Sequence, residues 1–181
     1  MKTLTLLRHA KSTWDDPVAR DFDRPLNRRG RKAAWTVGRE MREQGLAFDA
    51  VIASPAVRVV ETLAEVREGY GDGLEPAYDK RVYLAATATL LDLVHEIDDA
   101  KERVLIVGHN PGLEQLVLLL AREGGLRDEA AVKYPTATLA EIALPVERWR
   151  DVAAGMGSLT RFTRPRDLDP ELGPDEDSFQ A

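Results

Sequence analysis

Three short apolar runs that each stop at a polar turn constrain the fold of this chain more than any other feature. Residues 3–7, 50–53 and 103–107 have the length and the aliphatic content of buried strands. Each run is followed, directly or after a loop, by a segment with apolar residues at helical spacing. Strands that alternate with helices are joined by right-handed crossovers and form a mainly parallel sheet covered on both faces. The sequence therefore predicts an α/β fold, a three-layer α/β/α sandwich with a mainly parallel central sheet.

Other segments fit between these runs. The prolines and polar residues of 14–26 predict a loop over the end of the first strand. Helices are predicted from Asn27 as N-cap to Gly45, from Ser54-Pro55, from Thr87, and from Asn110-Pro111 to Gly124-Gly125. Further strands are expected near 74–78, at the edge of the sheet because of Pro76, and at 138–144, 149–152 and 158–162.

The length of 181 residues suits one domain with a single core. We expect this domain to span residues 1–168, because no linker divides that part of the chain. Residues 169–181 hold five acidic residues, two prolines and no basic residue. Such a segment cannot bury enough apolar surface to order itself, so a flexible acidic tail is expected there.

Charge and composition exclude several classes of protein. The net charge of −6 disfavours a general nucleic-acid binder, although two local basic clusters, 28–32 and 161–166, could attract an anion. No apolar run has the length of a membrane span, and the start lacks the pattern of a signal peptide. The chain has no cysteine, which excludes disulfides, thiolate metal sites and a cysteine nucleophile. A cytoplasmic location without membrane or nucleic-acid partners is expected.

Arginine and histidine residues occupy the turns that follow the three central strands. Arg8 and His9 end the first, Arg58 lies just after the second, and His109 follows the third. The carboxyl ends of parallel strands lie at one edge of the sheet, so these side chains can converge there. Arginine matches phosphate oxygens with a planar fork of donors, and histidine can accept a phosphoryl group as a covalent nucleophile. The pattern predicts a phosphoryl-transfer site.

Each of these residues also has a simpler structural interpretation. Arg8-His9 is a common dipeptide, Arg58 could form a helical ion pair with Glu61, and His109 could cap its helix. Their matched positions after three separate strands favour a shared site over three unrelated structural roles.

Several motifs, in this order, carry a family resemblance. The sequence is similar to the histidine phosphatase superfamily, and within it most resembles the SixA-type phosphohistidine phosphatases, which have a phosphoglycerate mutase-like fold. The residues that carry the resemblance are Leu7-Arg-His-Ala-Lys-Ser12, Arg24-Pro-Leu26 with Gly30, Ala53-Ser-Pro-Ala-Val-Arg-Val-Val-Glu-Thr-Leu63, Val107-Gly-His-Asn-Pro111 and Phe162-Thr-Arg-Pro-Arg-Asp-Leu168. Residues 1–168 would then be a histidine phosphatase domain.

The resemblance implies roles for individual residues. His9 would be the phosphorylated nucleophile, and Arg8, Arg58 and His109 would bind the phosphoryl group. Ser12 would add a hydroxyl donor. Arg24 would reach the phosphate from its loop, unless it forms an ion pair with Asp21 or Asp23. No metal or other cofactor is implied.

The general acid is the point at which the sequence departs from the family. Many members carry a glutamate on a helical insertion between the two main motifs, whereas the corresponding segment here, 81–87, is short and has no acidic residue. Asp15, Asp16 and Glu61 are candidates from elsewhere. Phosphohistidine needs an acid catalyst least, because its leaving nitrogen can already carry a proton.

These observations predict a metal-independent phosphatase with a phosphohistidine intermediate, whose substrate is a phosphohistidine protein. A small-molecule phosphomonoester phosphatase and a mutase are alternatives, although 81–87 offers neither a recognition pocket nor a carboxylate. A non-catalytic module that binds a phosphorylated ligand is the third alternative. Partners are therefore a phosphorylated protein or a small phosphorylated substrate.

Overall fold

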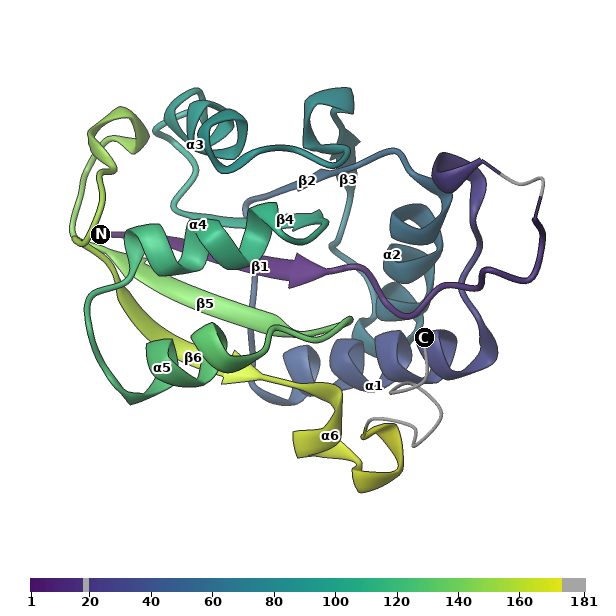
Figure 1. Cartoon of the computed structure of the whole chain (residues 1–181). Coiled ribbons are helices and arrows are strands. Elements are labelled where there is room, and N and C mark those ends of the chain that lie inside the picture. The colour runs from purple at the N-terminus through teal and green to yellow at the C-terminus, as the bar shows by residue number, and fades with distance from the viewer. Residues whose placement is uncertain (18–19, 174–181) are drawn as a thin grey trace.

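A six-stranded sheet forms the centre of the computed structural model, which describes residues 1–17 and 20–173 (Figure 1). Its order is β3-β2-β4-β1-β5-β6. Strands β3, β2, β4 and β1 are mutually parallel, β5 runs antiparallel to β1, and β6 runs antiparallel to β5. The strands are β1 (Lys2–Arg8), β2 (Ala50–Ala53), β3 (Pro76–Tyr78), β4 (Arg103–Gly108), β5 (Leu139–Leu144) and β6 (Ser158–Thr163). The mainly parallel sheet and the edge position of β3 are confirmed.

Helices cover both faces of this sheet, which confirms the three-layer architecture (Figure 1). One face is covered by α1 (Arg28–Glu43) and α2 (Val57–Tyr70), with α6 (Pro165–Leu168) against α1. The other is covered by α3 (Thr87–His95) and α4 (Gly112–Leu120), with α5 (Gly125–Val132) beside α4. Across the described residues, none of these helices combines the length and the apolar character that a membrane span requires.

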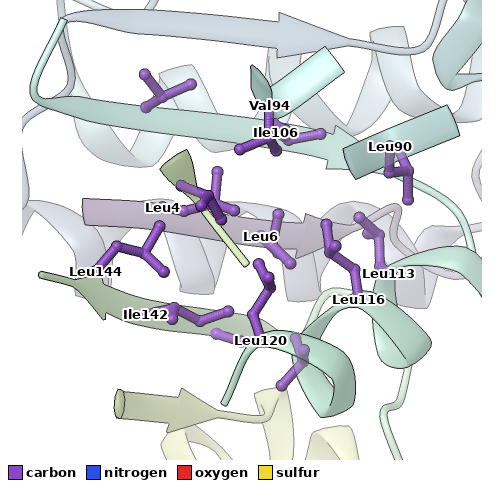
Figure 2. Packing of buried hydrophobic residues seen from close by; sticks show 14 of the residues in the cluster. Leu4, Leu6, Leu90, Val94, Ile106, Leu113, Leu116, Leu120, Ile142 and Leu144 are labelled. Carbon is purple, nitrogen blue, oxygen red and sulfur yellow. The ribbon is translucent and has the colours of Figure 1, made fainter. Parts of the chain in front are cut away.

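Alternating side chains of β1 hold the central strand between the two helical layers. Leu4 and Leu6 belong to the apolar cluster on the α3 and α4 face, together with Leu113 and other leucines (Figure 2). Leu7 belongs to the cluster on the α1 and α2 face. All three leucines are fully buried, and burial of each such side chain stabilises the folded state by roughly 1.5–3 kcal/mol. The register of β1 is therefore fixed from both sides, and so is the position of the residues that follow it.

The start of α1 agrees with the sequence prediction. The Asn27 side chain accepts a hydrogen bond from the Gly30 backbone N–H at 2.8 Å, as an N-cap does. A Cβ atom at position 30 would lie 2.1 Å from the Lys11 carbonyl oxygen, so only glycine fits. This close approach places the loop after β1 directly against α1.

The two helices that follow β2 and β4 begin later than the sequence predicts. Ser54-Pro55 is not the start of α2, which begins at Val57, and α4 begins at Gly112 after Pro111. The Ser54 hydroxyl accepts from the Ala56 N–H within the turn, and the Asn110 side chain accepts from the Glu114 N–H. Both side chains thus stabilise the turn, but the backbone needs extra residues to leave the strand before it becomes helical.

Two other sequence predictions are wrong. Gly124-Gly125 does not end the preceding helix, which stops at Leu120; it lies at the start of α5, a polar helix with one buried residue that the apolar periodicity did not reveal. Residues 149–152 are not a strand, because Trp149–Asp151 form a 3-10 turn. The turn is fixed by the fully buried Trp149, whose indole N–H donates to the Lys101 carbonyl.

The acidic segment differs from the prediction in the part that is described. Pro170–Leu172 form a 3-10 turn, and the Asp169 side chain accepts from the Glu171 N–H. Lys32 of α1 pairs with Asp169 at 3.4 Å and with Glu171 at 3.2 Å, and Leu172 packs against the core on the α1 face. These contacts hold residues 169–172 against the domain, whereas the composition predicted a solvated tail there. The remainder of the predicted flexible tail, 174–181, lies outside the described residues.

Candidate active site

The carboxyl ends of β1, β2 and β4 place three distant segments side by side. The His9 N–H donates to the Gly108 carbonyl at 3.0 Å, and the Ser54 N–H donates to the Val107 carbonyl at 3.1 Å. These bonds extend the sheet pairing into the turns. The rings of His9 and His109 consequently lie 5.3 Å apart, and the Arg58 guanidinium lies 3.2 Å from the His109 ring. Arg8, His9, Arg58 and His109, which we call the strand-end cluster, are thus brought together.

His9 is buried and oriented by the backbone of the next residue. Its Nδ1 lies 2.7 Å from the Ala10 carbonyl oxygen, which can only accept, so Nδ1 carries the ring proton. Burial lowers the pKa of His9 to about 3, and the charge of Arg8 contributes in the same direction. The ring is therefore neutral at pH 7 and Nε2 has a free lone pair, the state that a nucleophile needs.

His109 is also neutral, but both of its ring nitrogens are bound within the protein. The Arg58 guanidinium can only donate, so Nδ1 accepts from it, and Nε2 donates to the Ser54 hydroxyl at 2.7 Å. Burial lowers the pKa of His109 to about 3, and the neighbouring Arg58 charge is the second cause. Arg58 therefore fixes the tautomer of His109, and Ser54, predicted only as a helix cap, accepts the Nε2 proton.

Arg58 is held by Asp21, a residue that the sequence analysis did not place in the site. The Arg58 side chain is only 2% exposed, and it donates to the Asp21 carbonyl at 2.7 Å and to the Asp21 carboxylate at 3.0 Å. The Tyr83 hydroxyl donates to the same carboxylate at 2.5 Å. Burial raises the pKa of Asp21, but the Tyr83 hydrogen bond and the Arg58 charge outweigh it and lower the pKa to about 2. Asp21 is thus ionised at neutral pH.

Arg24 contacts both Ser12 and the same aspartate. Arg24 donates to the Asp21 carboxylate at 3.0 and 3.2 Å and to the Ser12 hydroxyl at 2.7 Å. Its guanidinium stacks on the Trp14 ring, 3.3 Å from the ring centre. Of the two alternatives that the sequence left open for Arg24, the structure contains the ion pair with Asp21.

Arg8, the last residue of β1, contacts the loop between α5 and β5. Its guanidinium donates to the Tyr134 carbonyl at 2.9 Å, and the Tyr134 hydroxyl donates to the Leu6 carbonyl. The buried Nε atom of Arg8 has no hydrogen-bond partner among the described residues. Arg8 is therefore positioned through one donor, while its other donors remain for a ligand.

Asp15 and Glu61, two of the three candidate general acids, are held outside the strand-end cluster by their described contacts. Asp15 and Asp16 are exposed in the loop after β1. Glu61 accepts from the Leu26 N–H at 2.9 Å and from Arg31 at 3.2 Å, so its carboxylate joins α2 to the start of α1. Within the part of the chain that the structure describes, neither Asp15 nor Glu61 forms a hydrogen bond or ion pair with the cluster. The positions of Asp15 and Glu61 therefore do not favour either residue as the proton donor.

Thr62 is a further residue that sequence analysis missed. Its hydroxyl accepts from the Ala10 N–H at 2.9 Å and donates to the Arg58 carbonyl at 2.6 Å. It thereby ties the segment that follows His9 to α2. The available signal was a threonine one helical turn after Arg58 on the inward face of the helix. The sequence did not show that its hydroxyl would bond to the Ala10 N–H.

The site as a whole offers positive charge and one free lone pair. Two arginines and the amino ends of α2 and α4 lie at this edge, which favours an anion. Within residues 1–17 and 20–173, no group of three or more His, Cys, Asp or Glu side chains is placed to hold a metal ion. The arrangement suits a phosphoryl group whose oxygens meet guanidinium donors while its phosphorus faces His9.

Comparisons with known proteins show which family the chain is related to. Residues 4–83 match the family model of the histidine phosphatase superfamily (branch 1). An uncharacterised protein of Mycobacterium tuberculosis (strain CDC 1551 / Oshkosh) is 34% identical over 164 residues, which cover 88% of this chain and 100% of that protein. An uncharacterised chloroplastic protein of Arabidopsis thaliana is 28% identical over 167 residues, which cover 86% and 72%.

Solved structures extend the similarity over the whole fold. A candidate phosphohistidine phosphatase SixA from Nakamurella multipartitia is 28% identical, with a TM-score of 0.78 over 91% of this chain and 96% of that one. Its counterpart from Agrobacterium tumefaciens is 27% identical, with a TM-score of 0.74 over 91% and 98%. The histidine phosphatase SixA in complex with tungstate, at 20% identity and a TM-score of 0.72 over 92% and 99%, shows the same fold.

Proposed function

Because the chain belongs to the histidine phosphatase superfamily and is of its SixA type, we propose that it removes phosphoryl groups from phosphohistidine in proteins. Membership makes it a phosphatase that acts on phosphorylated substrates. The observation that carries the finer proposal is the state of His9, whose Nδ1 proton is held by the Ala10 carbonyl while Nε2 is free. A neutral, oriented imidazole beside two arginines is ready to accept a phosphoryl group.

In the first step, His9 Nε2 attacks the phosphorus and the P–N bond of the substrate phosphohistidine breaks. The electron pair of that bond remains with the departing imidazole nitrogen, and the phosphoryl group is now on His9. Arg8 and Arg58 neutralise the equatorial oxygens, where charge is spread in the transition state. In the second step a water oxygen attacks the same phosphorus and the P–Nε2 bond breaks, with its electron pair returning to Nε2. The water protons leave with the phosphate, so the products are free His9 and inorganic phosphate.

His109 contributes by a change of protonation. A phosphoryl dianion raises the pKa of a neighbouring histidine, so the ring gains a proton on Nδ1 while Nε2 continues to donate to Ser54. Nδ1 then donates to a phosphoryl oxygen, and the Arg58 donor that it had accepted from is released to another oxygen. The substrate thus converts an internal hydrogen bond into two contacts with itself.

The absence of an acid in the strand-end cluster favours an easy leaving group. Asp21 approaches most closely among the carboxylates whose contacts are described, through Arg58, but its pKa of about 2 leaves no proton to donate at pH 7. An alkoxide leaving group would need such a proton. A phosphohistidine whose other ring nitrogen is protonated leaves as neutral imidazole, so it fits this site.

Turnover by His9→Ala tests the proposal. Wild type and variant are incubated with a phosphohistidine protein and with an aryl phosphate, and phosphate release is measured. His95→Ala is the matched control, because it removes the third histidine, at the end of α3, where it contacts Val152. We expect loss of both activities in His9→Ala alone. Turnover equal to wild type in His9→Ala would refute the mechanism, and hydrolysis of the aryl phosphate alone by wild type would refute the substrate.

A further inference from the structure

A basic cavity lies beside the strand-end cluster and shares Arg8 with it, and the reaction described above uses none of its other lining residues. Its volume is about 240 Å³. Four segments line it: the end of β1 with its following loop, α1, the loop before β5, and α6 with the turn after it. Six of its lining residues are cationic: Arg8, Lys11, Arg29, Lys133, Arg164 and Arg166.

The cavity is where the two basic clusters of the sequence meet. Arg29 comes from the cluster at 28–32, and Arg164 and Arg166 come from the cluster at 161–166. Packing of α6 against α1 brings them together. Six like charges around one cavity repel each other, and such an arrangement concentrates anions from solution.

Acidic neighbours compensate only part of this charge. Asp167 pairs with Arg164 at 3.0 Å, and Glu129 lies 4.0 Å from the same guanidinium. Lys133 and Arg166 form no ion pair with any described carboxylate. Asp169 and Glu171, the nearest acids in sequence to α6, are bound by Lys32 instead. Lys133 and Arg166, at least, therefore keep a positive charge that the described acidic residues do not neutralise.

Arg8 connects this cavity with the nucleophile. Its backbone precedes His9, its guanidinium lines the cavity, and its Nε atom has no partner in the described structure. The remaining wall is apolar and includes Pro135, Pro165 and Leu172. A cavity with cations on one side and apolar side chains on the other suits anionic groups attached to a carbon skeleton.

We propose that the basic cavity is a second anion subsite, which binds acidic side chains next to the phosphohistidine of a protein substrate. The inference rests on the proposed function, because it places the phosphoryl group at His9. Lys133 and Arg166 are exposed at the rim, where they can follow a peptide, and Arg8 bridges the two anions. The cavity would thus determine which phosphohistidine proteins are hydrolysed fastest.

A matched pair of peptides tests the subsite. The two phosphohistidine peptides have equal length and differ only in two flanking residues, Asp in one and Asn in the other. We expect wild type to prefer the acidic peptide about tenfold in kcat/KM, the factor that two partly exposed ion pairs supply. The preference should fall to roughly twofold or less in Lys133→Ala/Arg166→Ala and decrease with added salt.

Arg67→Ala/Arg150→Ala is the control, because it removes two exposed cations outside the cavity with the same change in net charge. It should keep the wild-type preference. Equal kcat/KM for the two peptides in wild type, or an unchanged preference in Lys133→Ala/Arg166→Ala, would overturn the subsite. Since the preference is a ratio, a general loss of folded protein cannot imitate it.

A second pair of substrates separates failure of the subsite from failure of the proposed function. If neither peptide is hydrolysed, the phosphohistidine proposal falls, and aryl phosphates with and without a carboxylate substituent are compared instead. A preference for the carboxylate that Lys133→Ala/Arg166→Ala abolishes would assign the cavity to a small-molecule anion. It would overturn the acidic peptide as the occupant. No preference in either pair would overturn the anion subsite altogether.

Discussion

The strand-end cluster and the basic cavity are both rich in positive charge and share Arg8, yet they hold that charge differently. In the cluster, Arg58 is buried and bonded to Asp21 and His109, and His9 Nδ1 and both nitrogens of His109 each have one defined partner. In the cavity, Lys133 and Arg166 are exposed and lack a described carboxylate partner. Fixed partners preorganise groups for one transition state, whereas exposed cations on flexible stems adapt to several anions. The strand-end cluster is therefore suited to chemistry, and the basic cavity to the recognition of anions.

Removal of Arg58 should give the largest effect. Arg58→Ala deletes a charged donor to the phosphoryl oxygens and leaves Asp21 without its main cation. We expect kcat to fall about 10³-fold, as for the loss of a preorganised transition-state donor. Arg58→Lys should recover little, because a lysine cannot reproduce the paired contacts to Asp21 and His109. The measurement is steady-state hydrolysis of an aryl phosphate, and a loss below tenfold in Arg58→Ala would contradict the account.

Removal of the Asp21 charge should come next. Asp21→Asn keeps the shape of the side chain but weakens its hold on Arg58 and ends the charge-assisted bond from Tyr83. We expect kcat to fall about 30-fold with a smaller change in KM, because the cost of a misplaced donor appears mainly in the transition state. Asp23→Asn is the control, since Asp23 pairs only with the exposed Arg20 among its described contacts. Equal losses in the two variants would show that loop stability, rather than Arg58, is the cause.

The two buried histidines should make stability depend on pH. His9 and His109 have pKa values of about 3 in the folded chain, against an ordinary value near 6.5 when unfolded. Below pH 6.5 the unfolded chain binds more protons, so stability falls as pH falls toward 3. Between pH 6.5 and pH 5 each histidine should contribute about 2 kcal/mol to this loss.

Urea unfolding at several pH values measures that slope. His9→Asn should retain about half of the wild-type slope between pH 6.5 and pH 5, because His109 still titrates. A slope equal to wild type in His9→Asn would mean that His9 is not held neutral by burial.

The single change Arg166→Ala should have the smallest effect. It removes one exposed cation from the basic cavity and leaves the hydrogen bonds of Arg58 to Asp21 and His109 unchanged. We expect kcat/KM for the acidic peptide to fall only about twofold to threefold, the typical scale of one exposed ion pair. A 100-fold loss in Arg166→Ala would remove the distinction between the two basic regions, because it would place Arg166 among the groups that stabilise the transition state.

The sequence predicted the strand-end cluster because each member directly follows, or lies one turn beyond, a short apolar run. Strand periodicity and parallel topology together determine the edge at which those runs end. Asp21 was not predicted, since the loop 14–26 has no periodicity, and its partner Tyr83 is 62 residues away. Its role depends on how the loop folds over the sheet edge, which short-range patterns do not encode.

Ser54 had a predicted role in its own turn, but its contact with a distant turn was not predictable from the sequence. A serine before a proline is typical of a helix start, and the hydroxyl does accept a backbone N–H in the turn. The same oxygen also accepts from His109, a contact between turns that follow two different strands. The basic cavity was equally hard to predict. Its two basic clusters were visible in the sequence, but their convergence depends on the packing of α6 against α1.

Mapping of the phosphoryl group on the enzyme tests the central claim most directly. Wild-type protein is mixed with excess phosphohistidine substrate and quenched in alkali, and the modified residue is identified by peptide mass spectrometry. We expect one acid-labile phosphate on His9, and none on His109 or His95. Phosphate on any other residue, or substrate turnover with no phosphate on His9 at any quench time, would contradict it.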